Sequence, residues 1–361
     1  TCPATAAAEV ASEPKVMGRD ARAAVVATPK GDITTTSVLH ELLNLERIDS
    51  LIFRGSTQKV SWKRVFGGQT IAQALMAAFR TLEHTKPAHS LHAYFLRAGD
   101  ASKPIVYSVE KAREGRSYSV RRVTATQEGK TILVLSASFH IPEDECAAVH
   151  QSRMPRVLSP QESMKAGANI QSDFNGRQLG KGKVRVPPPV EMWLAPPAAA
   201  AAVTFLDRRG GTWEGKGPIN RGRRQSYWMR NTETGPADDI GFQQCAIAYM
   251  SDWGLGGTSL KQHRIGTERK IHQMASIDHS IWFHAPPFNS MEWLLYDVRS
   301  PRAAGSRGFC VGRMFTESGI HVATVSQEIM IRLAPIRQSR KKPAVKNSSS
   351  RQLSLDVRSK L

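Results

Sequence analysis

The chain has 361 residues, 40% of them hydrophobic, and a formal net charge of +19, a length that suits two domains of ordinary size or one large one. It has no run of about 18 apolar residues, so we expect no membrane insertion. The basic excess is compatible with nucleic-acid binding, but no zinc-finger spacing, basic-zipper heptad or RNP-type aromatic string accompanies it, so no nucleic-acid partner is expected.

The beginning of the chain is expected to be disordered, and the cysteines indicate no structural or metal site. Residues 1–36 mix Ala, Pro and Lys with acidic residues and lack a continuous apolar core, which predicts a disordered leader. The acidic residues beside Arg19 and Arg22 argue against an organelle transit helix. Four scattered cysteines without a Cys-x-x-Cys pair indicate neither a zinc site nor a disulfide framework; they are Cys2, Cys146, Cys245 and Cys310.

Two stretches without charge predict two wholly buried helices. The first lies between Arg64 and Arg80, and the second between Asp239 and Asp252. In each stretch, apolar residues cover nearly every side of a helix, which indicates burial all round. The sequence therefore predicts a sheet wrapped around each helix.

Strand-like runs broken by glycine turns follow each helix and predict hairpins over 118–140 and 309–330. Matching residues recur 190 positions apart, which predicts a duplicated domain; the pairs are Gly115 with Gly305, Gly129 with Gly319, and Ser136 with Ser326. We expect an N-terminal unit over 37–140, a linker over 141–183 without clear periodicity, and a C-terminal unit over 184–336. The expected fold class is α+β, with two antiparallel sheets each wrapped around a buried helix.

The end of the chain predicts where in the cell the protein is located. Residues 337–361 are poor in apolar side chains and rich in Arg, Lys and Ser, which predicts a disordered basic tail. Its last three residues, Ser359-Lys360-Leu361, spell a peroxisomal targeting signal. We therefore expect a peroxisomal import receptor as a partner and the peroxisomal matrix as the location.

Several common catalytic motifs are missing from the sequence. There is no Gly-x-Ser-x-Gly elbow, no Walker-type loop and no His-Glu-x-x-His helix. The glycines at 254–257 lack dinucleotide-fingerprint spacing and follow a helix instead of a strand. No cofactor and no metal are expected.

Five segments together resemble the type II acyl-CoA thioesterases, the bacterial TesB-like group and its peroxisomal relatives. They are 53–55 (FRG), 65–69 (VFGGQ), 92–100 (HAYFLRAGD), 276–284 (SIDHSIWFH) and 292–296 (EWLLY). The resemblance covers about 38–333 and is weakest across the linker. It implies a double hotdog fold, hydrolysis of fatty acyl-CoA to free acid and CoA in fatty acid metabolism, and a homo-oligomer.

The resemblance also implies a catalytic trio that holds the attacking water. The acid falls on Asp252, the hydroxyl on Ser276, where bacterial members have threonine, and the glutamine on Gln327. Asp278 is the competing acid, and His279 and His284 are interpreted as packing or hydrogen-bonded histidines. We expect the helix dipole to raise the pKa of Asp252 at the carboxyl end of its helix.

Two further expectations concern the reaction. The glycine-opened helix start at Gly67-Gly68 is a candidate for the backbone N–H that binds the thioester carbonyl oxygen. The alternative function is a noncatalytic or hydratase-type hotdog protein that binds acyl-CoA. Hydratases of this fold use an Asp and a His close together in sequence, and no His follows Asp252 within five residues.

Overall fold

The computed structural model describes residues 37–57, 63–84, 86–143, 148–166, 189–198, 224–233, 235–261, 271–285 and 288–334. The expected leader, 1–36, and the expected tail, 337–361, with Ser359-Lys360-Leu361, lie outside these ranges, as do Cys2 and Cys146. Cys245 and Cys310 are free and buried. None of the helices in the described ranges has the length and apolarity needed to cross a membrane.

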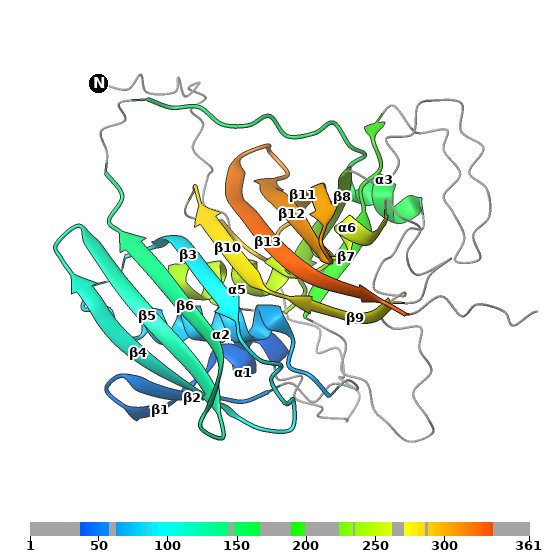
Figure 1. The fold of residues 1–361 in the computed structure, drawn as a ribbon. Helices are drawn as coiled ribbons and strands as arrows, with labels where there is room; N and C mark the ends of the chain where they lie inside the picture. Colours follow the sequence, from blue (N-terminus) through cyan, green and yellow to red (C-terminus); the bar gives the residue numbers. More distant parts are fainter. Residues whose placement is uncertain are drawn as a thin grey trace, which may run out of the picture.

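In the first half of the chain, the described residues form two helices and six strands, arranged as Figure 1 shows. They are α1 (Val38–Leu43), β1 (Glu46–Asp49), β2 (Ile52–Gly55), α2 (Gly67–Phe79), β3 (Ala88–Phe95), β4 (Ile105–Glu114), β5 (Tyr118–Gln127) and β6 (Lys130–His140).

The second half repeats this plan with further short helices. Its elements are α3 (Pro160–Lys165), β7 (Val190–Leu194), β8 (Arg224–Asn231), α5 (Ile240–Ser251), α6 (Thr258–Lys261), β9 (Ile271–Ser276), β10 (Asp278–Phe283), β11 (Leu294–Ala304), β12 (Arg307–Thr316) and β13 (His321–Leu333).

All strands within the described ranges belong to one antiparallel sheet of 13 strands. Its order is β1-β2-β4-β5-β6-β3-β10-β13-β12-β11-β8-β7, with β9 paired to β13 beside this path. The two halves are therefore arranged symmetrically about the central β3–β10 pair. The sequence predicted two separate sheets, and the β3–β10 ladder joins them, which pairs the backbone groups of two edges that would otherwise be open.

The helices α2 and α5 pack side by side under this sheet and run antiparallel (Figure 1). The end of α5 meets the start of α2, where the Gly68 N–H contacts Asp252, and the start of α5 meets the end of α2, where Gly241 lies beside Phe79. Both helices are buried over almost their whole length, as their uncharged sequences predicted. This arrangement places the two ends of the helix pair at two symmetry-related positions in the fold.

The hairpin turns follow the predicted duplication. Gly129 has a φ angle of 73° between β5 and β6, and Gly319, 190 positions later, has a φ angle of 92° between β12 and β13. Glycine adopts such positive φ angles without steric cost. The strands β4, β5 and β6 begin 189, 189 and 191 residues before β11, β12 and β13.

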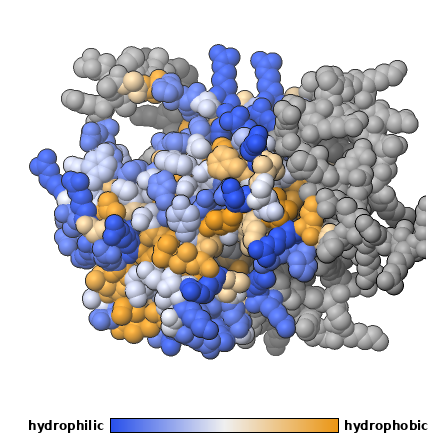
Figure 2. Space-filling view, in the orientation of Figure 1, coloured by the Kyte–Doolittle hydropathy of each residue, from blue (hydrophilic) through white to orange (hydrophobic). Residues whose placement is uncertain are grey.

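The described part of the predicted linker covers the outer face of the second half. It contains α3, which the sequence analysis did not predict and which begins with a capping box of Ser159 and Glu162. The indole N–H of Trp228 donates to the carbonyl of Leu158 at 2.8 Å. Elsewhere the outer face of the sheet carries hydrophilic and hydrophobic residues side by side (Figure 2).

Candidate active site

Asp252 lies at the junction of the two central helices. It is the C-cap of α5, and its Oδ2 accepts the backbone N–H of Gly68 at 2.9 Å, in the first turn of α2. A Cβ atom on Gly67 would come within 2.7 Å of the Asp252 carboxylate, and one on Gly68 within 2.5 Å of the carbonyl of Tyr249. The two glycines therefore allow the end of α5 to approach the start of α2 closely.

Gln327 joins Asp252 to Ser276. It lies on β13 with 1% of its surface exposed, and its Nε2 donates to Asp252 Oδ1 at 2.8 Å and to Ser276 Oγ at 2.7 Å. A carboxylate has only acceptors, so the amide nitrogen must face Asp252. Both hydrogens of the Gln327 amide are thus committed to the two other members of the predicted trio.

A β-bulge orients Ser276 toward Gln327. Ser276 pairs with Ile329, whereas Ser280 pairs with Ser326, so the register against β13 shifts by one residue between β9 and β10. Bulges of this kind change the direction in which a side chain points and are common next to active sites. The three residues implied by the resemblance are therefore brought into direct hydrogen-bonding contact from three separate elements.

Burial raises the pKa of the Asp252 carboxyl above its usual value, although the hydrogen bonds from Gln327 and Gly68 act in the opposite direction. The direction agrees with the expectation from the sequence, but the cause differs. Asp252 stands at the end of α5 and also at the start of α2, where the α2 dipole favours a negative charge. Loss of hydration, rather than the dipole of α5, accounts for the raised pKa.

Of the expected oxyanion donors at Gly67-Gly68, the Gly68 N–H is already in use. It donates to Asp252 Oδ2 and so is not free to bind a thioester carbonyl. The sequence analysis noted the glycine pair at the helix start but missed its function as a partner of the acid. The contact joins residues 184 positions apart, and only the pair of glycines at a buried helix start gave a signal for it.

The competing residues lie elsewhere in the site. Asp278 Oδ1 accepts the backbone N–H of Glu328 at 2.8 Å, so it secures the start of β10 rather than joining Gln327. His279 is fully buried and its Nε2 lies 2.8 Å from Ser251 Oγ, while His284 Nε2 lies 2.8 Å from Thr324 Oγ1. Both histidines are hydrogen-bonded, as the sequence analysis interpreted them.

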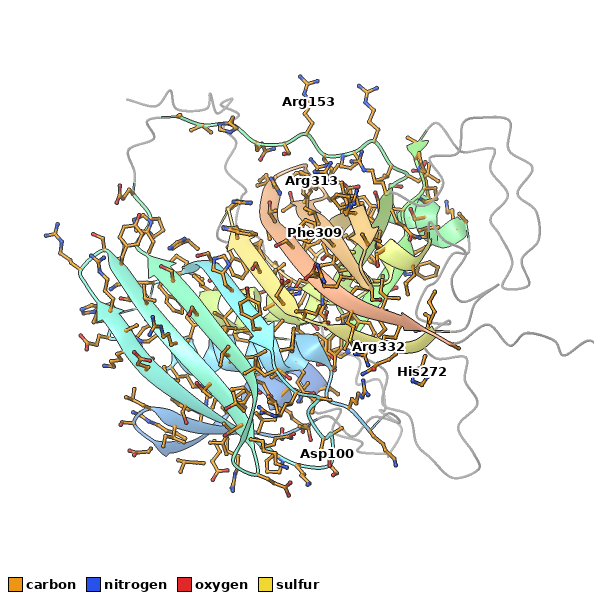
Figure 3. The ribbon with its side chains drawn as sticks, viewed as in Figure 1. Asp100, Arg153, His272, Phe309, Arg313 and Arg332 are labelled. Carbon is orange, nitrogen blue, oxygen red and sulfur yellow. The ribbon has the colours of Figure 1, made fainter. Side chains whose placement is uncertain are left out.

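The face of β9 that carries Ser276 continues toward the surface. Because side chains alternate along a strand, Met274 shares the face of Ser276, and it is exposed. The register against β13 shifts between Arg332 and Leu333, so this alternation does not extend to His272. His272 is exposed near the start of β9, and on the face opposite Ser276 Arg332 Nη1 contacts Gln273 Oε1 at 3.5 Å (Figure 3).

The symmetry-related position in the first half lacks the trio. Arg80 caps α2 as Asp252 caps α5, and Ala88 pairs with Phe139 on β6 as Ser276 pairs with Ile329 on β13. The residue 190 positions before Gln327 is Ala137. This end of the helix pair therefore has no carboxylate, hydroxyl and amide at the matching places.

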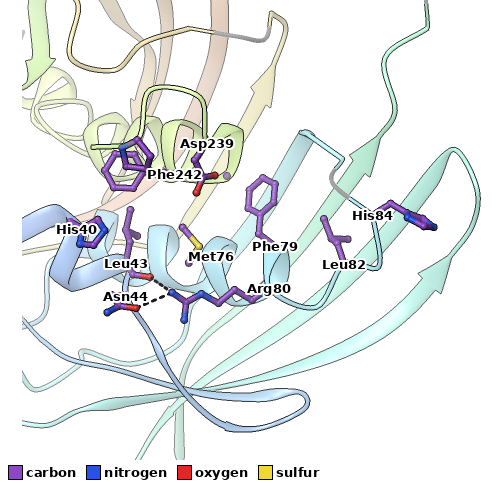
Figure 4. A pocket seen from close by; sticks show the side chains of 12 residues that line it. His40, Leu43, Asn44, Met76, Phe79, Arg80, Leu82, His84, Asp239 and Phe242 are labelled. Carbon is purple, nitrogen blue, oxygen red and sulfur yellow. Dashed lines mark hydrogen bonds between the residues drawn. The ribbon is translucent and has the colours of Figure 1, made fainter. Parts of the chain in front are cut away.

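A pocket of about 310 Å³ lies at that end, between α1, the end of α2 and the start of α5 (Figure 4). Arg80 lines it but donates to the carbonyls of Leu43 and Leu45 at the end of α1, and Asp239 lines it but accepts the Phe242 N–H as the N-cap of α5. The charged side chains of this pocket, Arg80 and Asp239, are therefore used in hydrogen bonds to the end of α1 and the start of α5. Within the described ranges, no group of three or more His, Cys, Asp or Glu is placed to hold a metal ion.

Comparison with known proteins identifies the family. The acyl-CoA thioesterase family profile matches residues 214–330, and the profile of the acyl-CoA thioesterase N-terminal domain matches residues 58–140. The chain is similar to human acyl-coenzyme A thioesterase 8, with 37% identity over 85% of this chain and 92% of that protein. It is also similar to acyl-CoA thioesterase 2 of Haemophilus influenzae, with 38% identity over 82% of this chain and 97% of that protein.

Solved structures agree on the fold. The acyl-CoA thioesterase II TesB2 of Mycobacterium marinum superposes with a TM-score of 0.62 and 33% identity, covering 83% of this chain and 99% of that chain. A hot dog fold protein of Alicyclobacillus acidocaldarius, at 18% identity and a TM-score of 0.61, supports the fold alone. The α+β double hotdog expected from the sequence is confirmed. The chain belongs to the type II acyl-CoA thioesterase family and is an enzyme that acts on acyl-CoA.

Proposed function

We propose that the enzyme hydrolyses fatty acyl-CoA with a water molecule that Asp252, Ser276 and Gln327 hold and activate. The observation that supports this most directly is the Gln327 amide, which bonds to the carboxylate and the hydroxyl at the same time. Because both of its amide hydrogens are used, Gln327 fixes the distance between the side chains of Asp252 and Ser276. Asp252 and Ser276 then contact the water.

The reaction follows from the remaining hydrogen-bonding capacity. Asp252 Oδ1 has a second lone pair to accept a proton from water, and the Ser276 hydroxyl, which already accepts from Gln327, has its own hydrogen to donate. The water oxygen attacks the thioester carbonyl carbon while Asp252 takes the water's proton. The raised pKa of Asp252 makes it a better base than an exposed carboxylate.

The tetrahedral intermediate then collapses, and the carbon–sulfur bond breaks. The leaving group is a thiolate, whose conjugate thiol has a pKa near the ~8.5 of cysteine, so it departs without strong assistance. The proton held on Asp252 passes to the thiolate sulfur. The products are the free fatty acid and CoA, and the residues return to their starting protonation states.

Release of free thiol from acyl-CoA tests the proposed trio. We expect Gln327→Ala to lower kcat by roughly 10²-fold or more, because Asp252 and Ser276 lose the amide that holds them in position around the water. Gln273→Ala, on the outer face of the neighbouring strand β9, is the matched control and should retain the parent rate. If Gln327→Ala retained the parent rate in a folded protein, the trio would be wrong.

We propose the peroxisomal matrix as the location of the enzyme, on the basis of the terminal tripeptide Ser359-Lys360-Leu361. A 24% identical yeast relative is named peroxisomal acyl-coenzyme A thioester hydrolase 1, which is in line with this proposal. Deleting Leu361 should leave a fluorescently tagged enzyme in the cytosol. Import of the truncated chain into peroxisomes, in cells without a full-length copy, would refute the proposed targeting signal.

We further propose that the enzyme is a homo-oligomer. The outer face near the central β3–β10 pair exposes Tyr94 at 58% and Trp282 at 37% of their surfaces, and large exposed side chains of this kind favour self-association. Sedimentation should give a mass above that of one chain. Tyr94→Ser combined with Trp282→Ser should lower that mass, and a monomeric parent protein would contradict the proposal.

A further inference from the structure

Two buried polar atoms beside the trio have no hydrogen-bond partner among the described residues. They are Nδ1 of His279 and Oε1 of Gln327. Burying a polar atom without a partner is unfavourable, so such atoms are rare in folded proteins. Two of them in one region indicate that a further polar group belongs there.

The strand register brings these two residues next to each other. On β10 and β13, Ser280 pairs with Ser326 and Ile281 with Val325, so one step further along the ladder His279 stands opposite Gln327. Both side chains are buried and point from the sheet toward the helices. Residues that face each other in this way have Cβ atoms about 5 Å apart, so the two side chains are neighbours on the inner face of the sheet.

Gly256 lies beside the Gln327 oxygen. A Cβ atom on Gly256 would make an ordinary contact of 3.8 Å with Gln327 Oε1 but would come within 2.8 Å of Cγ2 of Ile329. A larger residue at this position would therefore crowd Ile329, next to the oxygen. A buried water needs at least two polar partners, and His279 Nδ1 and Gln327 Oε1 supply them.

The hydrogen bonds of Ser251 determine which histidine nitrogen carries the proton. Ser251 Oγ donates its only hydrogen to the carbonyl of Ala248 at 2.9 Å, and it lies 2.8 Å from His279 Nε2. His279 Nε2 must then be the donor to Ser251 Oγ, which leaves Nδ1 as a bare acceptor. Burial lowers the pKa of His279 to about 3, so the ring stays neutral at physiological pH.

We infer that His279 is a positioning residue for the trio and that one buried water donates its two hydrogens to His279 Nδ1 and Gln327 Oε1. This inference rests on the proposed role of Gln327. Holding the oxygen on the side away from Asp252 prevents the amide from rotating by half a turn. The two amide hydrogens then stay directed at Asp252 and Ser276, which keeps the reacting pair in place.

Two substitutions of His279 separate this role from a structural one. Asparagine places its amide oxygen near the position of Nδ1 and loses the bond to Ser251, whereas glutamine places a donor near the position of Nε2 and loses the acceptor at Nδ1. We expect His279→Gln to lower kcat about tenfold with KM unchanged, the scale of one lost hydrogen bond that acts in the transition state. His279→Asn should keep kcat within about threefold of the parent value.

The matched control is His284→Gln, which changes an exposed histidine just beyond β10 that contacts Thr324 and not the trio. It should retain the parent kcat. If His279→Asn were the more damaged of the two His279 variants, the bond to Ser251 would carry the effect and the inference would be overturned.

A double-mutant cycle with Gln327→Ala tests whether His279 acts through Gln327. We expect His279→Gln to cause no further loss of kcat in the Gln327→Ala background. An equal loss in both backgrounds would overturn the inference. Full activity of Gln327→Ala alone would instead refute the proposed function, so the two failures are distinguishable.

Nitrogen-15 NMR of histidine-labelled parent enzyme tests the same inference without any substitution. We expect the proton of His279 on Nε2 and an unprotonated Nδ1 across neutral pH. A proton on Nδ1 would overturn the proposed water bridge, and this result does not depend on whether any variant folds.

Discussion

Replacing Asp252 by asparagine changes one atom of the site and removes the proposed base. The carboxylate accepts two hydrogen bonds, one from Gly68 N–H on Oδ2 and one from Gln327 Nε2 on Oδ1. Asparagine has only one oxygen, so its NH₂ group must face one of these two donors. The variant therefore loses both the proton acceptor and one of the bonds that orient it.

The expected loss of activity follows from the roles of the two groups. Removing a positioned general base typically costs 10²–10⁴-fold in rate, and we expect a fall in kcat of at least about 10²-fold, which corresponds to about 2.7 kcal/mol of transition-state stabilisation. The midpoint of thermal unfolding at pH 7 should not fall. The raised pKa of Asp252 means that its ionised form weakens the folded state at neutral pH, and asparagine removes that charge.

The assay is release of free thiol from a fatty acyl-CoA, with thermal unfolding as the check on folding. In the parent enzyme kcat/KM should fall as the pH is lowered through the raised pKa of Asp252, because the base must be ionised to accept a proton. Asp278→Asn is the matched control, since Asp278 bonds to the Glu328 backbone and not to Gln327. Parent-level activity of Asp252→Asn together with an inactive Asp278→Asn would show that the assignment of the acid is wrong.

Three other outcomes are expected. Ser276→Thr should remain active in the thiol-release assay, because threonine keeps the hydroxyl that Gln327 contacts; an inactive, folded variant would contradict that role. Burial opposes ionisation of Glu114, but hydrogen bonds from Ser119, Arg121 and Lys86 outweigh it and lower the pKa from 4.5 to about 2. Glu114→Gln should therefore lower the unfolding temperature at pH 7, where it leaves the buried Arg121 and Lys86 without their anion. The gap from the parent should close as the pH falls from 4.5 toward 2, since the ionised carboxylate stabilises the fold only above that range; a gap that did not depend on pH would contradict this. Apparent affinity for acyl-CoA should weaken as salt rises, because exposed charges are screened over about 10 Å at 0.1 M, and deleting residues 337–361 should leave this dependence unchanged; if the dependence vanished on truncation, the tail would be a substrate contact.

The sequence by itself determined the elements that depend on local patterns. The uncharged runs that end at Arg80 and at Asp252 became the two buried helices, because a helix without a polar face must be covered on all sides. The glycine turns at Gly129, Gly305 and Gly319 became hairpin turns with positive φ. Residues of the trio came from the resemblance, since no spacing rule links Asp252, Ser276 and Gln327 along the chain.

Only the tertiary structure decided how these elements meet. The bonds of the trio join residues 51 and 75 positions apart, and the bond from Gly68 to Asp252 spans 184 positions. Hydrophobic periodicity reports which face of one element is buried and carries no information about which residue of another element it contacts. The β3–β10 ladder and the bulge that brings Ser276 and His279 to either side of Gln327 are set by pairing between distant strands, so they become visible only in the folded chain.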